Sequence, residues 1–216
     1  RLDGIGLSKK YLKNSISHKR FNNIMSQSLY STYGVLYKNF KDDIEKNIFL
    51  GFIICSDEVS IVLNPNEKKY ERRIYKTVTT LASTFSSFFT MSGSQSKNKD
   101  NRIKGAFDGR PIILSSLEEV SNYMIYRYTI FIRNSISKLL RIKGVCDDEL
   151  YSKLNYNNID YYCLKIKELN LLNDVEKIFS LATLYIPTSS DKLDRYNFQT
   201  IDEFSKVVKS IYKDKV

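Results

Sequence analysis

The chain has 216 residues, of which 42% are apolar, and its 34 basic and 24 acidic side chains leave a net charge of +10. No apolar run approaches the roughly 20 residues that a membrane-spanning helix needs, and a single histidine, His18, argues against a Ser-His-Asp triad or a poly-histidine metal site. The charge favours a polyanionic partner, nucleic acid above all, although a solvated basic face would give the same balance.

The three cysteines, Cys55, Cys146 and Cys163, have no metal-ligand spacing. We expect them to be reduced packing residues, because free cysteine behaves as a small apolar side chain. This cysteine usage, together with the absence of a long apolar segment, predicts an intracellular protein with no membrane partner. We expect it in the cytoplasm, and a mitochondrial location stays open.

Hydrophobic periodicity predicts helices and strands along the first 141 residues. A first strand ends at Asp3, and since most of it would precede residue 1 we expect this strand to be truncated. The turn Ser56-Asp57-Glu58 joins two central strands, and Ser116 with Glu119 forms a capping box. The other predicted elements are a helix from about 20 to 41, strands at 48–55 and 59–63, a helix from 74 to 88, a polar loop from 91 to 105, a strand at 111–114 and a helix from about 117 to 141.

This order is the split βαβ pattern of a ferredoxin-like sheet, an α+β fold. In that topology the first two strands are parallel and the third lies antiparallel between them, so Asp3 and Asp57 meet at one sheet edge. We expect an antiparallel sheet with helices on one face over residues 1–145. A smaller α/β extension should follow over 146–216, with a helix at 201–213 preceded by the N-cap Thr200.

Two close carboxylates beside a glycine-containing turn are what a magnesium–nucleotide site needs. Asp3 and Asp57 are the candidates, although aspartates are also ordinary turn residues. The segment from Gly4 to Ser8, with Gly6 inside it, leads toward a helix and would present backbone N–H groups to triphosphate oxygens.

Several segments resemble signatures of the tRNA-His guanylyltransferase family, the 3′-to-5′ RNA polymerases. The segments similar to its R-[IV]-D-G, S-D-E, R-R-x-x-K and F-D-[GA]-R signatures are Arg1-Leu2-Asp3-Gly4, Ser56-Asp57-Glu58, Arg72-Arg73-Ile74-Tyr75-Lys76 and Phe107-Asp108-Gly109-Arg110. Lys19 with Phe21-Asn22 is similar to the K-P-x-D loop, with Arg20 in place of proline. The resemblance covers residues 1 to about 141 and is thin beyond.

The helix after the fourth strand indicates a branch of the family. Tyr126-Arg127 and Arg133-Asn134-Ser135 resemble the Thg-one-like proteins, whereas the eukaryotic enzymes carry H-I-N-N-L-Y-N where this chain has residues 131–137 and no histidine. Members of the Thg-one-like branch repair 5′-truncated tRNAs by template-directed addition. Strict addition of a single G to histidine tRNA is therefore not the expected activity.

The resemblance implies a polymerase palm that adds nucleotides to the 5′ end of tRNA or tRNA-like RNA, with GTP and ATP as substrates, two Mg²⁺ ions and a homotetrameric assembly. It implies that Asp3 and Asp57 bridge the metals, that the carbonyl of Gly4 is a further ligand, and that Glu58 aids metal binding or activation or holds a base. The implied nucleotide-binding residues are Asp3, Gly4, Ile5, Gly6, Leu7, Ser8, Lys19, Ser56, Asp57, Arg73 and Lys76, and the implied RNA-binding residues are Arg127, Arg133 and Asn134.

Several of the residues in these motifs could instead have a purely structural role. Arg73 and Lys76 lie one helical turn apart and either clamp phosphates or form a solvated basic face. Asp108 and Arg110 could form an ion pair that braces a loop, and the Arg133-Asn134 pair could cap a break in the long helix.

Two other functions also stay open. A nucleotide cyclase or cyclic-dinucleotide synthase also pairs an early Asp with a D-E hairpin, but the R-R-x-x-K and F-D-G-R segments and the absence of a G-G-D-E-F-type turn argue against it. A catalytically silent RNA-binding palm is the other alternative, against which the intact Asp3, Asp57 and Glu58 argue.

Overall fold

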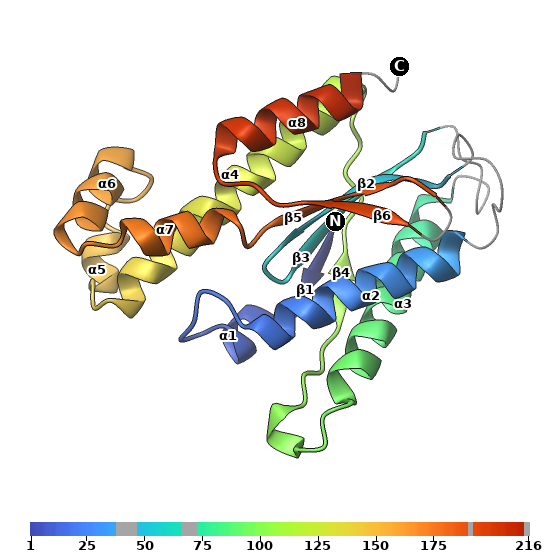
Figure 1. The fold of residues 1–216 in the computed structure, drawn as a ribbon, viewed down its shortest axis with the longest axis horizontal. Coiled ribbons are helices and arrows are strands. Elements are labelled where there is room, and N and C mark those ends of the chain that lie inside the picture. Colours follow the sequence, from blue (N-terminus) through green and yellow to red (C-terminus); the bar gives the residue numbers. More distant parts are fainter. Residues whose placement is uncertain (38–46, 66–72, 190–191, 214–216) are drawn as a thin grey trace.

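A six-stranded antiparallel sheet forms the centre of the protein in the computed structural model, which describes residues 1–37, 47–65, 73–189 and 192–213 (Figure 1). The strands are β1 (Leu2–Gly4), β2 (Phe49–Cys55), β3 (Glu58–Leu63), β4 (Phe107–Gly109), β5 (Thr183–Pro187) and β6 (Leu193–Tyr196). The helices are α1 (Leu7–Tyr11), α2 (Lys19–Tyr37), α3 (Ile74–Ser94), α4 (Leu117–Ile142), α5 (Asp147–Leu150), α6 (Ile159–Glu168), α7 (Leu172–Phe179) and α8 (Ile201–Lys213), with a 3-10 turn, η3 (Lys99–Asn101).

The sheet confirms the predicted ferredoxin-like topology. The strand order is β4-β1-β3-β2-β5-β6, and both β1 and β2 pair antiparallel with β3. The first two strands are therefore parallel to each other with β3 between them. Asp3 lies opposite Glu58, one residue from the hairpin turn, so the end of β1 and the β2–β3 turn share one sheet edge.

Helices cover both faces of the sheet, because β2 and β5 are apolar on both sides. On one face Leu2, Phe52 and Val59 pack with the apolar sides of α2 and α3. On the other face Ile53 and Leu184 pack with α4 and α8. The prediction of helices on one face holds for α2 and α3 and is wrong for α4 and α8.

The fourth strand lies earlier in the chain than predicted. Pairing with β1 selects Phe107–Gly109, and the ring of Phe107 packs edge-to-face against Phe85 and Phe89. The predicted strand at 111–114 is wrong: Pro111 has no N–H for a ladder, and Ile113 is 83% exposed. Helix α3 also continues to Ser94, so the predicted loop at 91–105 begins within its last turn. The predicted end of the preceding helix near residue 41 lies outside the described residues.

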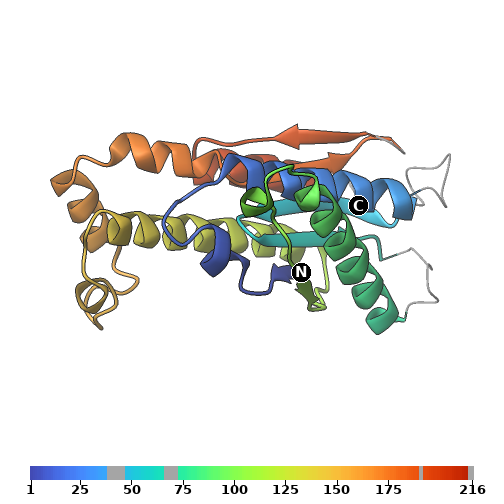
Figure 2. The same ribbon diagram turned by 90° about the horizontal axis from the view of Figure 1, so that it is seen from below.

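The C-terminal segment continues the same sheet, since β5 pairs with β2 and β6 pairs with β5. Helix α8 has the predicted bounds, and its first turn donates from the Glu203 N–H to Oγ1 of Thr200 at 3.1 Å. The boundary between residues 1–145 and 146–216 stays a prediction. Figures 1 and 2 both place α5, α6 and the C-terminal end of α4 together at one end of the molecule.

No helix among the described residues has the length and apolarity to span a bilayer. All three cysteines are free; Cys55 is buried, whereas Cys146 and Cys163 are exposed, so the packing role predicted for them is wrong at those two positions.

Candidate active site

Asp3 and Asp57 line the same cavity, which has a volume of about 890 Å³. The turn between β2 and β3 consists of Ser56 and Asp57, and Ser56 takes a positive φ of 60°, which is uncommon for a residue other than glycine. Its neighbour Asp57 is held against the end of β1, where the Gly4 N–H donates to the Asp57 carbonyl at 3.0 Å. The two aspartates thus lie together, as the topology predicted.

The carboxylate of Asp57 also holds the start of α1. The Ser8 N–H donates to Oδ2 at 2.9 Å and the Ser8 hydroxyl donates to Oδ1 at 2.7 Å. Each carboxylate oxygen has two lone pairs, so one acceptor position on each remains for a further partner. Asp3 is less engaged: its side chain is 40% exposed, and its ion pair with Arg1 is 4.0 Å long.

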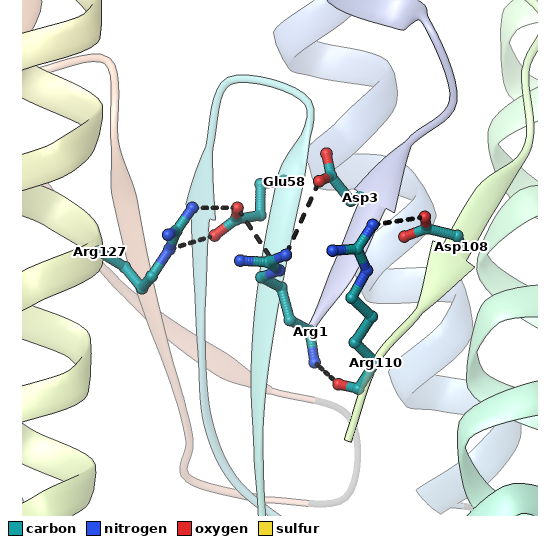
Figure 3. Close-up of polar contacts among 6 residues, drawn as sticks. All are labelled: Arg1, Asp3, Glu58, Asp108, Arg110 and Arg127. Atoms are coloured by element: carbon teal, nitrogen blue, oxygen red, sulfur yellow. Dashed lines mark hydrogen bonds and ion pairs between the residues drawn. The ribbon is translucent and has the colours of Figure 1, made fainter. Parts of the chain in front are cut away.

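Glu58 is the most enclosed carboxylate of the site, with 11% of its side chain exposed (Figure 3). Arg127 on α4 donates from Nε to its Oε1 at 2.9 Å and from Nη2 to its Oε2. Nε of Arg1 lies 3.8 Å from Oε2. Glu58 is therefore neutralised by two guanidinium groups, and Arg127, predicted to bind RNA, is committed to an internal ion pair.

The Asp108 and Arg110 side chains form an ion pair at 3.2 Å on β4 and the segment after it, beside Arg1 (Figure 3). The Arg1 and Arg110 backbones exchange hydrogen bonds that extend the β1–β4 ladder. The structural ion pair predicted for Asp108 and Arg110 is therefore present.

The cavity walls carry cationic side chains that the motif analysis did not single out. Lys9 and Lys13 come from α1 and the loop after it, and Lys138 and Arg141 come from α4. Helical spacing could have found the last two, because Arg127, Asn134, Lys138 and Arg141 recur at intervals that keep them on one face of α4. What could not be seen in the sequence is that this face looks onto the Asp57 turn.

Other predicted residues lie apart from the carboxylates. Lys19 lines an adjoining hollow of about 250 Å³, which shares Ser56 with the main cavity. Arg73 precedes α3, whose first turn lines a separate cavity together with Leu63, at the end of β3 away from Glu58. Lys76 lies on the same turn of α3 and is likewise absent from the lining of the Asp57 cavity. Phosphate contact by Arg73 and Lys76 stays a prediction.

The Arg133 and Asn134 side chains contact each other, because Nη2 of Arg133 donates to Oδ1 of Asn134 at 3.2 Å, but they have different further surroundings. Asn134 lines the main cavity, whereas Nη1 of Arg133 donates to Oδ1 of Asn157 at 2.6 Å and its guanidinium lies 5.8 Å from the centre of the Tyr156 ring. Helix α4 runs unbroken through both positions, so neither residue caps a break.

The segment from Gly4 to Ser8 has fewer available N–H groups than the sequence suggested. Gly4 and Ser8 donate to Asp57, and Ile5 donates to the Ala106 carbonyl at 3.0 Å. Gly6 takes a positive φ of 67°. Gly6 and Leu7 are therefore the positions of this segment left to approach a phosphate with their N–H groups.

The donor set fits Mg²⁺, which takes oxygen ligands and is usually held by one or two carboxylates plus waters and substrate phosphates. Asp3, Asp57 and the Gly4 carbonyl supply such oxygens. Within the described ranges, no group of three or more His, Cys, Asp or Glu side chains is placed to hold a metal on its own. Waters and the phosphate oxygens of a nucleotide would supply the remaining ligands of an ion held by these groups.

Comparison with known proteins bears directly on this site. The family model described as tRNAHis guanylyltransferase matches residues 1–115, which include β1, the Asp57 turn and β4. The chain belongs to this family of nucleotidyltransferases. A bacterial tRNA(His) guanylyltransferase (Thg1)-like protein in complex with ATP has a similar fold, with a TM-score of 0.69 and 19% identity over 98% of this chain and 87% of that one.

The corresponding structure in complex with GTP has a TM-score of 0.55, again at 19% identity over the same shares of the two chains. No protein with a curated description matches the chain. Family membership and the mixed α+β fold confirm the resemblance seen in the sequence, and they place the Asp3–Asp57 edge in the part of the chain that the family model covers.

Proposed function

We propose that this protein is a template-dependent 3′-to-5′ nucleotidyltransferase that adds nucleotides to the 5′ end of tRNA or a tRNA-like RNA, as in 5′-end repair. The observation that carries the proposal is the pair of carboxylates, Asp3 and Asp57, in a cavity that is also lined by the cationic side chains of Lys9, Lys13, Lys138 and Arg141. Membership of the tRNAHis guanylyltransferase family and the ATP and GTP complexes of the bacterial relatives support it.

In the proposed reaction, Asp3, Asp57 and the Gly4 carbonyl would hold two Mg²⁺ ions. Such ions lower the pKa of the attacking 3′-hydroxyl of the incoming nucleotide and neutralise charge on the phosphoryl oxygens. Ser8 keeps the Asp57 carboxylate in place through two hydrogen bonds. Glu58, enclosed by Arg127 and Arg1, acts by positioning β3 and α4 on either side of the cavity.

The test is extension of a 5′-labelled, 5′-truncated tRNA with ATP, GTP and Mg²⁺. Asp3→Asn is the informative variant, because the exposed Asp3 side chain makes only a long ion pair and its loss should leave the fold intact. Asp194→Asn on β6 removes the same charge at the far edge of the sheet and serves as the control.

Product that depends on the templating base and is lost in Asp3→Asn but not in Asp194→Asn supports the proposal. Wild-type protein that makes no extended RNA refutes it. Incubation with nucleotides alone then distinguishes the remaining alternatives: a cyclic product indicates a cyclase, and no product indicates an RNA-binding palm. The homotetramer that the family resemblance implies is checked by light scattering, where a monomer would contradict it.

A further inference from the structure

Lys138 and Arg141 form a cationic pair on the cavity face of α4. They are three residues apart, which places them as neighbours on one side of the helix, and both line the cavity that contains Asp3 and Asp57. Both follow Arg127 along α4, toward the end of the helix that precedes α5. Neither has an ion pair among the described residues, in contrast to Arg127, which is neutralised by Glu58.

The two cationic side chains of this pair are close together, and this placement is electrostatically unfavourable without a bound anion. Lys138 is partly buried, and burial lowers its pKa, with the charge of Arg141 lowering the pKa further and Asp57 opposing both. Like charges one turn apart on a helix repel. An anion bound between the two side chains would relieve that repulsion and would replace the water that Lys138 has lost.

We propose that Lys138 and Arg141 bind a phosphate chain, either the triphosphate of the nucleotide or the phosphorylated 5′ end of the RNA. The inference rests on the proposed function in taking this cavity as the transfer site. Arginine suits bidentate contact with phosphate oxygens and lysine supplies a point charge. Lys9 and Lys13 line the same cavity from the α1 side, so a phosphate chain near Asp57 would have cations on two sides.

Both residues lie outside the range 1–115 that the family model matches. The assignment therefore comes from the placement of α4 over the Asp57 turn and from no family signature. In this assignment α4 binds a ligand as well as holding the fold together through the ion pair of Arg127 with Glu58.

The test is direct binding, measured by calorimetry in Mg²⁺ with the double variant Lys138→Gln/Arg141→Gln. The probes are inorganic tripolyphosphate, GTP and guanosine, and two RNA oligonucleotides of one sequence with a 5′-triphosphate or a 5′-hydroxyl. We expect the affinity for at least one triphosphate-bearing probe to fall by about tenfold or more, because hydrogen bonds to charged groups are lost. Affinity for guanosine and for the 5′-hydroxyl RNA should not change.

Two controls separate this effect from charge and from folding. Lys143→Gln/Lys177→Gln removes two positive charges that both lie near Asp174, outside the cavity, and should bind every probe as the wild type does. Lys138→Arg/Arg141→Lys keeps both charges and should keep the affinity for triphosphate within a few-fold. Thermal unfolding of all variants verifies that each is folded.

Weaker binding of GTP and tripolyphosphate identifies the nucleotide as the source of the phosphate chain, and weaker binding confined to the 5′-triphosphate RNA identifies the RNA end. Wild-type affinity of the double variant for all probes, or an equal loss for both RNAs, overturns the proposal. A wild-type protein that binds tripolyphosphate through these residues but extends no RNA would refute the proposed function and leave this inference standing.

Discussion

Replacing Arg127 with methionine should destabilise the protein by about 3 kcal/mol. The substitution leaves the Glu58 carboxylate, 11% exposed, facing only Arg1 at 3.8 Å. Breaking a buried ion pair from one side typically costs 3–5 kcal/mol, because an uncompensated charge remains inside. We expect the lower end of that range, since Arg1 still offers partial compensation.

The double variant Glu58→Leu/Arg127→Met should be less destabilised than Arg127→Met alone, because it leaves no buried charge behind. Replacing a buried ion pair by apolar side chains of similar volume is often neutral or stabilising. Urea unfolding of the wild type, both single variants and the double variant yields the coupling free energy between the two positions. Arg110→Met, which removes an exposed partner of Asp108, should change stability by less than about 1 kcal/mol.

A stabilising role of the ion pair is refuted if Arg127→Met unfolds at the wild-type urea concentration, or if the double variant loses the sum of the two single effects. The same proteins test the predicted catalytic role of Glu58. A stable double variant that still extends RNA would show that Glu58 acts only through the fold, whereas a stable and inactive one would support a contribution to the reaction.

Asp57→Asn should abolish Mg²⁺-dependent GTP binding, and unchanged GTP affinity would contradict the metal assignment. Its free energy of unfolding should stay within about 2 kcal/mol of the wild-type value, because one amide oxygen can still accept from Ser8. Gly93→Ala should lower the free energy of unfolding by more than about 2 kcal/mol, since its Cβ would lie 1.9 Å from the Ile103 carbonyl oxygen. The added Cβ of Gly34→Ala in α2 has no neighbour within 4 Å and should stabilise the protein by about 0.5–1 kcal/mol, so equal melting temperatures of the two variants would contradict this prediction. Burial raises the pKa of the Cys55 thiol well above its usual value, so this thiol stays protonated at pH 8. A thiol reagent should therefore titrate two cysteines in the native protein and three in denaturant, and three fast-reacting thiols in the native protein would contradict the burial of Cys55.

Local patterns in the sequence were sufficient for most of the fold. The apolar runs on either side of Ser56-Asp57-Glu58 predicted the β2–β3 hairpin, and the capping residues Ser116 and Thr200 marked the starts of α4 and α8. These features depend on hydrogen bonds and periodicity within a few residues, which is why they can be read without a structure. The right-handed crossover rule then placed Asp3 beside Asp57.

The fourth strand shows where local patterns fail. The run 111–114 is more apolar than Phe107–Gly109, yet the latter forms β4 because its backbone pairs with β1 and Phe107 fits between two rings of α3. Strand formation at a sheet edge depends on a partner distant in the chain, and a short apolar run does not carry that information.

Sequence and tertiary structure decided different parts of the site. The sequence by itself determined the carboxylates, the glycine turn and the order of elements that brings them together. Only the packing of α4 across the sheet decided that Arg127 neutralises Glu58 and that Lys138 and Arg141 line the cavity that contains Asp57. The packing of α3 likewise decided that Arg73 lies away from this cavity. These relations join residues far apart in the chain, so their geometry follows from the packed core and from no local motif.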